Sequence, residues 1–195
     1  MRLSDGEILT SRIVSSSTVH IYGAGLNQER PAHSAVKELA GRGWAPAPIH
    51  PHDAGATIEG FPIRPEVDEG ITPEIVVLFL APKRALSVVK QLLFRFQAHE
   101  FPLVWFQRGA KDCDAVSILE DIGVEFVIDD CIVEYINRNS LVKSNKIPVL
   151  PWCRQTKDTR KDGCSIWTVF KGTETNIVCH EELEWTGDLW DLRDS

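Results

Sequence analysis

The stretch TVHIYGAGLNQERPAHSAVKELAGRGW, residues 18–44, combines a strand pattern, a glycine loop and a helix pattern in direct succession. Residues 18–22 are mostly β-branched or aromatic, which favours a strand. Apolar residues then recur at helical spacing up to a glycine pair, which predicts a helix with one apolar face. The proline-rich residues 44–51 resume an extended pattern. The stretch therefore predicts a strand–loop–helix–strand unit.

The same alternation continues through the next part of the chain. Continuous apolar runs are typical of strands that are buried on both faces of a parallel sheet, and such runs occupy residues 74–82, 101–110 and 124–130. Helical periods occupy residues 82–99, 112–123 and 131–139. Alternating strands and helices of this length predict an α/β fold, Rossmann-like and doubly wound around a mainly parallel sheet.

Both ends of the chain carry additional elements. Ser4 and Glu7 stand at capping-box spacing, which predicts a short leading helix over residues 4–13. After residue 140 no period is sustained, but strand-like runs at 164–170 and 175–183 flank a short polar turn and predict a β-hairpin. We therefore divide the chain into a Rossmann-like domain, residues 1–139, and an extension that contains the hairpin, residues 140–195.

The extension is rich in tryptophan, because four of the six tryptophans of the chain are Trp152, Trp167, Trp185 and Trp190. Such aromatic content is untypical of disordered segments. We expect the extension to pack on the main domain or on a partner, and a homo-oligomer formed through it is one alternative. Its Cys153, Cys164, Cys179 and His180 are too widely spaced for a recognisable zinc motif, so packed cysteines are the favoured interpretation.

The composition narrows the classes of partner. The formal net charge of −7 over 195 residues argues against nucleic acid as the main partner, because phosphate backbones require Lys and Arg. No apolar run approaches the roughly 20 residues that span a bilayer, so no membrane partner is expected. The N-terminal residues also lack the continuous apolar segment of a signal peptide, which favours a cytoplasmic protein.

The glycine loop follows the first predicted strand, where parallel sheets bind their ligands. It departs from the dinucleotide fingerprint, because Gln28 stands where the third glycine is required. The second strand also ends on His50 and His52 rather than on the acidic residue that holds a ribose. NAD is therefore disfavoured, and on these residues alone the loop is either a phosphate site or a tight turn without a ligand.

Five segments, taken in order, carry a family resemblance. They are TVHIYGAGLNQERPAHSAVKELAGRGW, PIHP, EIVVLFLAPKRALSVVKQLL, LVWFQRGA and GVEFVIDDCIVEY, and together they span residues 15–138. The set resembles CoA-binding domains related to the N-terminal domain of the succinyl-CoA synthetase α subunit. More narrowly, it is similar to the small stand-alone CoA-binding proteins of bacteria and archaea. Those proteins often have a serine beside the loop glycine and an Asn-Pro after the second strand, where this chain has Gly25 and His50.

The resemblance implies a set of ligand-binding residues. The pyrophosphate of CoA would be faced by Gly23, Ala24, Gly25, Leu26, Asn27, Arg30 and Pro31. The adenosine end would lie near His50, Pro51 and His52. The nucleotide would be bordered by Ala81, Pro82 and Lys83, and the far side of the cleft would be lined by Gln107 and Gly109.

The leading hypothesis is thus a protein that binds CoA or an acyl-CoA, with no catalytic residue and no metal ligand assigned. One alternative is a nucleotide-dependent enzyme, either an NAD-type oxidoreductase or an acyl-CoA ligase-like subunit. Another is an interaction module that uses the Trp-rich extension. Lys83, Arg84 and Arg108 are either cations that screen ligand phosphates or a solvated rim. Cys131 is expected to be a small buried residue rather than a reactive thiol.

Overall fold

A five-stranded parallel sheet forms the centre of the molecule in the computed structural model, which describes residues 1–4, 6–158 and 163–189. Its strands lie in the order β2 (Ala45–Ile49), β1 (Thr18–Tyr22), β5 (Ile75–Leu78), β6 (Leu103–Phe106) and β7 (Phe126–Val127). All four neighbouring pairs are parallel, which confirms the predicted sheet.

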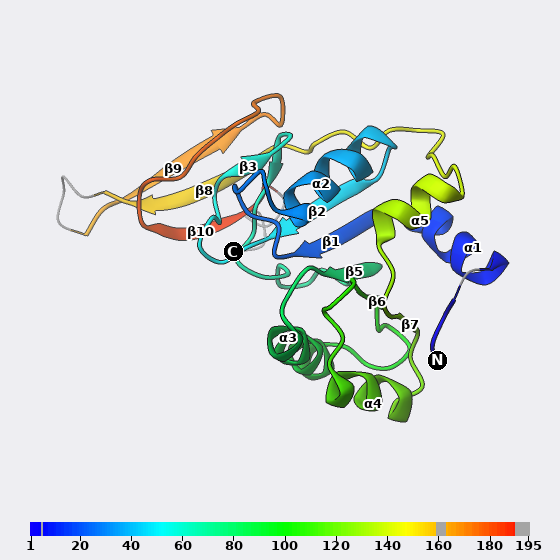
Figure 1. The fold of residues 1–195 in the computed structure, drawn as a ribbon. Helices are drawn as coiled ribbons and strands as arrows, with labels where there is room; N and C mark the ends of the chain where they lie inside the picture. Colours follow the sequence, from blue (N-terminus) through cyan, green and yellow to red (C-terminus); the bar gives the residue numbers. More distant parts are fainter. Residues whose placement is uncertain (5, 159–162, 190–195) are drawn as a thin grey trace.

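Helices cover both faces of the sheet (Figure 1). One face carries α1 (Glu7–Ser15), α2 (Pro31–Gly41) and α5 (Ile132–Arg138), and the other carries α3 (Pro82–Arg95) and α4 (Cys113–Asp121). Alternate residues of a strand point to opposite faces. Val19 and Ile21 therefore pack in the apolar cluster with α1, α2 and α5, whereas Tyr22 packs in the cluster with α3 and α4. The predicted doubly wound, Rossmann-like fold is confirmed.

The first helix departs from its predicted start. α1 begins after Gly6, and no side chain caps it, so the predicted capping box of Ser4 and Glu7 is wrong. The preceding residues lie along β7 instead, where Leu3 N–H donates to Phe126 O over 2.7 Å. Pairing with the sheet edge therefore decides the course of this segment. α3 also ends at Arg95 rather than at residue 99, because the backbone at Phe96 is already extended.

Asp112 caps the N-terminus of α4, because its Oδ1 accepts from the backbone N–H groups of Asp114 and Ala115 at 3.0 and 3.2 Å. Replacing Asp112 with alanine leaves these donors without their acceptor. We expect Asp112→Ala to lower the free energy of unfolding by about 1 kcal/mol, measured by urea denaturation. The matched control Asp112→Asn keeps a side-chain oxygen and should change it by less than about 0.5 kcal/mol; an equal loss in both variants would contradict the capping role.

The extension forms a separate three-stranded antiparallel sheet in the order β10 (Leu183–Asp188), β8 (Trp152–Lys157) and β9 (Ser165–Phe170). Figure 1 shows it beside the two-stranded hairpin of β3 (Thr57–Ile58) and β4 (Phe61–Pro62). The first strand of the predicted hairpin is thus present as β9, but its pairing was predicted wrongly, because β9 pairs with β8 and not with residues 175–183. Trp190, predicted to take part in packing, lies outside the described residues.

Contacts with the main domain explain this difference. Ile177 N–H donates to Thr57 Oγ1 and Thr57 N–H donates to Ile177 O, both over 2.9 Å. This part of the predicted second strand is therefore bonded to the edge of β3. β8, which the sequence patterns did not indicate, becomes the partner of β9, and the rings of Trp152 and Phe170 stack 4.2 Å apart across the pair.

Candidate functional site

The order of the sheet reverses between β1 and β5, because the chain leaves β1 toward β2 on one side and later enters β5 on the other. Loops that leave two such strands in opposite directions open a crevice at their carboxyl ends. A cavity of about 810 Å³ lies at this point. Its walls come from the glycine loop after β1, the turn after β2, the segment after β5 and one face of α3. We call this cavity the cleft.

Eight of the fifteen ligand-binding residues that the resemblance implies line the cleft. Its lining includes Gly23, Gly25, Asn27, Arg30, His50, Pro51, His52 and Ala81. Seven others lie outside the lining: Ala24, Leu26, Pro31, Pro82, Lys83, Gln107 and Gly109. Ala24 is buried in the core and Leu26 packs against it, while Pro31, Pro82 and Lys83 are exposed at the helix starts. Gln107 and Gly109 follow β6, on the far side of β5 from the loop.

Sequence reasoning missed other parts of the lining. α3 contributes Arg84, Ser87, Val88 and Gln91, of which only Arg84 had been considered, as a rim charge. Their spacing of i, i+3, i+4 and i+7 places them on one helical face, and this signal was available in the sequence. Asp53 and Glu66 also line the cleft but belong to loops, and no local pattern indicated them.

Gly23 makes the turn out of β1 possible. Its φ of 91° lies in the left-handed region, and a Cβ added there would stand 2.5 Å from the carbonyl oxygen of Phe79. Glycine is required on both counts, since it tolerates positive φ and has no Cβ to collide. The loop can therefore lie directly against the end of β5 at the floor of the cleft.

Gly25 lies against a pair of polar side chains from the turn after β2. A Cβ added there would collide with Asp53 Oδ2 and approach His50 Cγ and Nδ1 to 2.9 and 3.0 Å. Asp53 Oδ2 accepts a 2.8 Å hydrogen bond from Leu26 N–H, and it lies 3.1 Å from His50 Nδ1. The latter contact has ion-pair distance but not the alignment of a hydrogen bond. The side chain of His50, one departure from the resembled pattern, thus occupies space that any side chain at Gly25, the other departure, would need.

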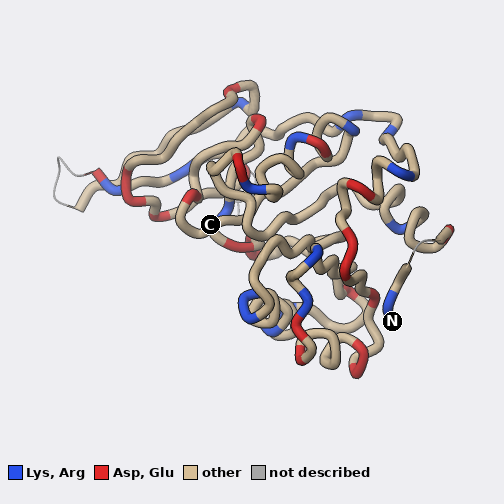
Figure 2. Tube along the Cα trace, viewed as in Figure 1, with Lys and Arg blue, Asp and Glu red and all other residues tan. Residues whose placement is uncertain are grey.

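Two helix N-termini and two arginines of the cleft can attract an anion, although Asp53 and Glu66 also line it. α2 and α3 both begin at the cleft, and neither has an acidic residue in its first turn. Figure 2 shows that Lys and Arg are the only charged residues on α3, although the chain is acidic overall. Neither Arg30 nor Arg84 forms an ion pair within the described residues. Helix N-termini and unpaired guanidinium groups together are typical of phosphate and carboxylate sites.

The other two predicted rim charges do not reach the cleft. Arg108 pairs with Glu134, with 2.6 Å between Nη2 and Oε2, and Lys83 is exposed outside the lining. Cys131, at the N-cap of α5, is only half-buried, so its predicted burial is wrong. In the extension, packing of the cysteines holds for Cys153, which is buried, but not for Cys164, which is exposed.

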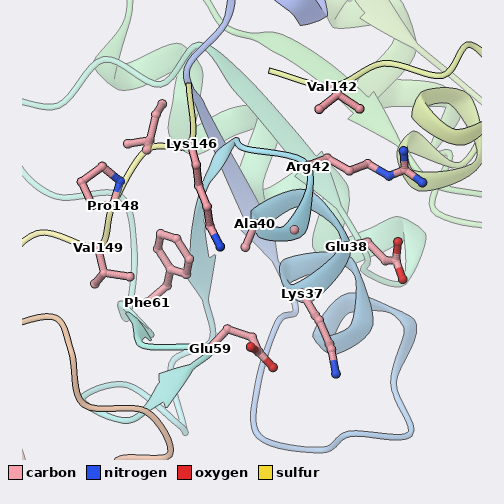
Figure 3. Close-up of a pocket in the computed structure, with 12 residues that line it drawn as sticks. Lys37, Glu38, Ala40, Arg42, Glu59, Phe61, Val142, Lys146, Pro148 and Val149 are labelled. Atoms are coloured by element: carbon pink, nitrogen blue, oxygen red, sulfur yellow. The ribbon is translucent and has the colours of Figure 1, made fainter. Parts of the chain in front are cut away.

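A second cavity, of about 750 Å³, lies against the last turns of α2 (Figure 3). It is closed by the β3–β4 turn and by the connector that leads to β8, and it contains none of the predicted site residues. Figure 3 shows Lys146 and Phe61 directed into it. A helix C-terminus carries a partial negative charge, which disfavours an anion. The second cavity lacks the two helix N-termini and the loop after β1 that line the cleft, although Lys37, Arg42 and Lys146 border it.

Among the described residues, no group of three or more His, Cys, Asp or Glu side chains is placed to hold a metal ion. No helix within the same ranges combines the length and apolar character needed to cross a bilayer.

Comparisons with known proteins show the family of the chain and its fold. The family model described as "CoA binding domain" matches residues 17–136, well over half of the chain. A Thermus thermophilus protein of known structure matches with 23% identity and a TM-score of 0.61, over 68% of this chain and 96% of its own. A conserved hypothetical protein from Pyrococcus furiosus matches with 26% identity and a TM-score of 0.54, over 62% and 99%. These structures share the fold. Through the match over residues 17–136, the chain belongs to the CoA-binding domain family.

Proposed function

We propose that this protein binds CoA or an acyl-CoA in the cleft, with the pyrophosphate facing the glycine loop. The observation that carries the proposal is the convergence of two helix N-termini and two unpaired arginines, Arg30 and Arg84, on one cavity. Family membership supports CoA as the ligand. The volume of about 810 Å³ is within the usual range for ligands of this kind.

The residues of the cleft fit the chemical parts of such a ligand. Gly23 and Gly25 let the backbone approach phosphate oxygens closely, and Arg30 and Arg84 supply positive charge. The exposed Pro51 and His52 border the side on which we place the adenosine end. CoA itself would supply a thiol that carries acyl groups as thioesters. We assign no catalytic role to any residue.

Copurified ligand provides the first test. Mass spectrometry of small molecules released from the native protein should detect CoA or an acyl-CoA, and calorimetric titration should show CoA binding more tightly than NAD. Tighter binding of NAD would reject this proposal in favour of the oxidoreductase alternative.

Charge reversal at the cleft should weaken CoA binding selectively. Arg84→Glu replaces an attraction to the ligand phosphates with a repulsion, so we expect the Kd of CoA to rise at least about tenfold. Isothermal titration calorimetry measures the change. Lys90→Glu is the matched control, because it makes the same charge change on the exposed part of α3 outside the lining. An equal loss in both variants would mean that the effect is general electrostatics rather than binding in the cleft.

We also propose that residues 1–139 and 140–195 are separate units, the first of which binds the ligand. The family match ends at residue 136, and none of the strands described in residues 140–158 and 163–189 joins the parallel sheet. The extension is nevertheless attached to the main domain, where Arg154 Nη1 donates to Gly55 O over 2.7 Å. Gly55 follows the turn that carries Asp53, so the extension supports one wall of the cleft.

A further inference from the structure

We propose that His50, which the resemblance implies at the adenosine end, instead contacts the ligand pyrophosphate, and that this contact strengthens when its imidazole ring is protonated. The inference rests on the proposed function, because it requires a phosphate-bearing ligand in the cleft. It adds a regulatory property to that site, namely coupling of ligand binding to proton uptake. Three observations carry this inference. The ring of His50 packs against Gly25, its Nδ1 lies close to Asp53, and other charged groups surround the ring.

The ring of His50 has a defined orientation. Its Cγ–Nδ1 edge faces Gly25, since an added Cβ there would lie 2.9 and 3.0 Å from these two atoms. Nε2 stands on the opposite edge of an imidazole ring. The side chain lines the cleft and keeps 32% of its surface exposed, although Nδ1 itself is buried. The exposed part is therefore the edge that carries Nε2, which is free to donate to a ligand oxygen when the ring is charged.

Asp53 performs two functions at this point. Its Oδ2 lies 3.1 Å from His50 Nδ1, so a negative charge stands beside the ring and offsets the positive charge of the protonated form. The same oxygen accepts from Leu26 N–H, which removes one backbone donor of the glycine loop from the set available to an anion. The imidazolium group of His50 replaces that donor at the neighbouring position.

The other charged and titratable groups around His50 belong to few residue types. On its own turn are Asp53 and His52, whose ring centroid lies 6.0 Å away. From α2, His33 is bonded through Nδ1 to Gly25 O at 2.9 Å. Arg30, Arg84 and Glu66 complete the charged lining of the cleft. Of these residue types, only histidine ordinarily changes charge between pH 6 and 7.5.

The test is calorimetric titration with dephospho-CoA at pH 6.0 and pH 7.5. This probe lacks the 3′-phosphate monoester of CoA, which would itself titrate near pH 6, whereas its pyrophosphate keeps its charge. We expect binding to the native protein to be about fivefold tighter at pH 6.0. Titrations in buffers with different ionisation enthalpies should in addition show a net uptake of protons on binding.

Three variants assign the effect to one side chain. His50→Gln should lose most of the pH dependence, whereas His52→Gln and His99→Gln should keep it. His99 is the matched control, because it is an exposed histidine outside the lining of the cleft. Circular dichroism and thermal unfolding establish that each variant is folded, and His50→Asn provides a second substitution if His50→Gln is unstable.

The outcomes separate this inference from the proposed function. Binding of dephospho-CoA without pH dependence, or with a dependence that His50→Gln retains, overturns the role of His50 and leaves ligand binding in place. If the pH dependence of binding disappears in His52→Gln instead, His52 is the histidine responsible, and the proposal for His50 is overturned. Failure of both CoA and dephospho-CoA to bind at either pH rejects the proposed function itself.

Discussion

Replacing Gly25 with alanine is expected to raise the Kd of CoA at least about tenfold and to lower the free energy of unfolding by about 1–3 kcal/mol. The added Cβ would collide with Asp53 Oδ2 and crowd the ring of His50. Relief of this collision moves Asp53, so Leu26 N–H loses the acceptor that it holds at 2.8 Å. The glycine loop and the turn after β2 then separate. Because both segments line the cleft, their separation changes the proposed binding site. Titration calorimetry and urea denaturation measure the two effects.

Gly41→Ala is the matched control, because a Cβ at this exposed end of α2 meets no heavy atom within 4 Å. It should leave CoA binding unchanged and the stability equal or higher by up to about 1 kcal/mol. The double variant Gly25→Ala with Asp53→Ala removes the colliding oxygen. Its loss of stability should therefore be smaller than the sum of the two single losses, although the approach of the Cβ to His50 Cγ at 2.9 Å remains. Additive losses would contradict the contact between Gly25 and Asp53 as the cause.

The second large effect concerns acid stability and arises from His20 in the middle of β1. The side chain is 7% exposed, and its Nδ1 has no hydrogen-bond partner within the described residues. Burial, with a smaller contribution from the nearby positive charge of Arg64, lowers the pKa of His20 to about 4. The uncharged ring is therefore the form that the folded protein holds at neutral pH.

The sign of the pH dependence follows from this shift. In the unfolded chain His20 regains an ordinary pKa of about 6.5, so between about pH 6.5 and pH 4 the unfolded state binds more protons than the folded state. The contribution of His20 to stability is complete above this window and is lost as the pH falls through it. The expected loss is about 3 kcal/mol by pH 4, on the order of 1.4 kcal/mol for each pKa unit.

Urea denaturation at a series of pH values checks this expectation. His20→Leu has a similar volume and no titratable group, so its free energy of unfolding should fall less steeply between pH 6.5 and pH 4 than that of the native protein. His99→Gln, which removes an exposed histidine, should keep the native slope. A native slope in His20→Leu would show that other groups cause the acid sensitivity.

Much of the fold could be predicted because the deciding signals are local. Buried parallel strands read as continuous apolar runs, and β5 and β6 each consist entirely of buried residues. Pro82 begins α3 at the start of the helical period predicted over residues 82–99. The extension was predicted less well, because residues 175–183 have strand-like composition but Ile177 bonds to Thr57 instead of pairing with β9. Composition does not state which of two available partners a strand-like segment will take.

The lining of the cleft could be predicted in part for the same physical reason. The glycine loop, Arg30 and the turn containing His50 follow strands whose carboxyl ends must share one edge of a parallel sheet, and all of them line the cleft. Asp53 was missed, because its contact with Leu26 joins two loops that are 27 residues apart in the chain. Gln107 and Gly109 were expected at the cleft, but the strand order places the end of β6 beyond β5.

The sequence by itself therefore determined the α/β class, the parallel sheet and the position of the glycine loop, since apolar periodicity and glycine placement act within a few residues of each other. Only the tertiary structure decided that Gly25, His50 and Asp53 form one unit. In this unit His50 Nδ1 lies 3.1 Å from Asp53 Oδ2, and both side chains occupy the space that a Cβ at position 25 would need. A contact of that kind is decided by packing between segments, and no local pattern in either loop encodes it.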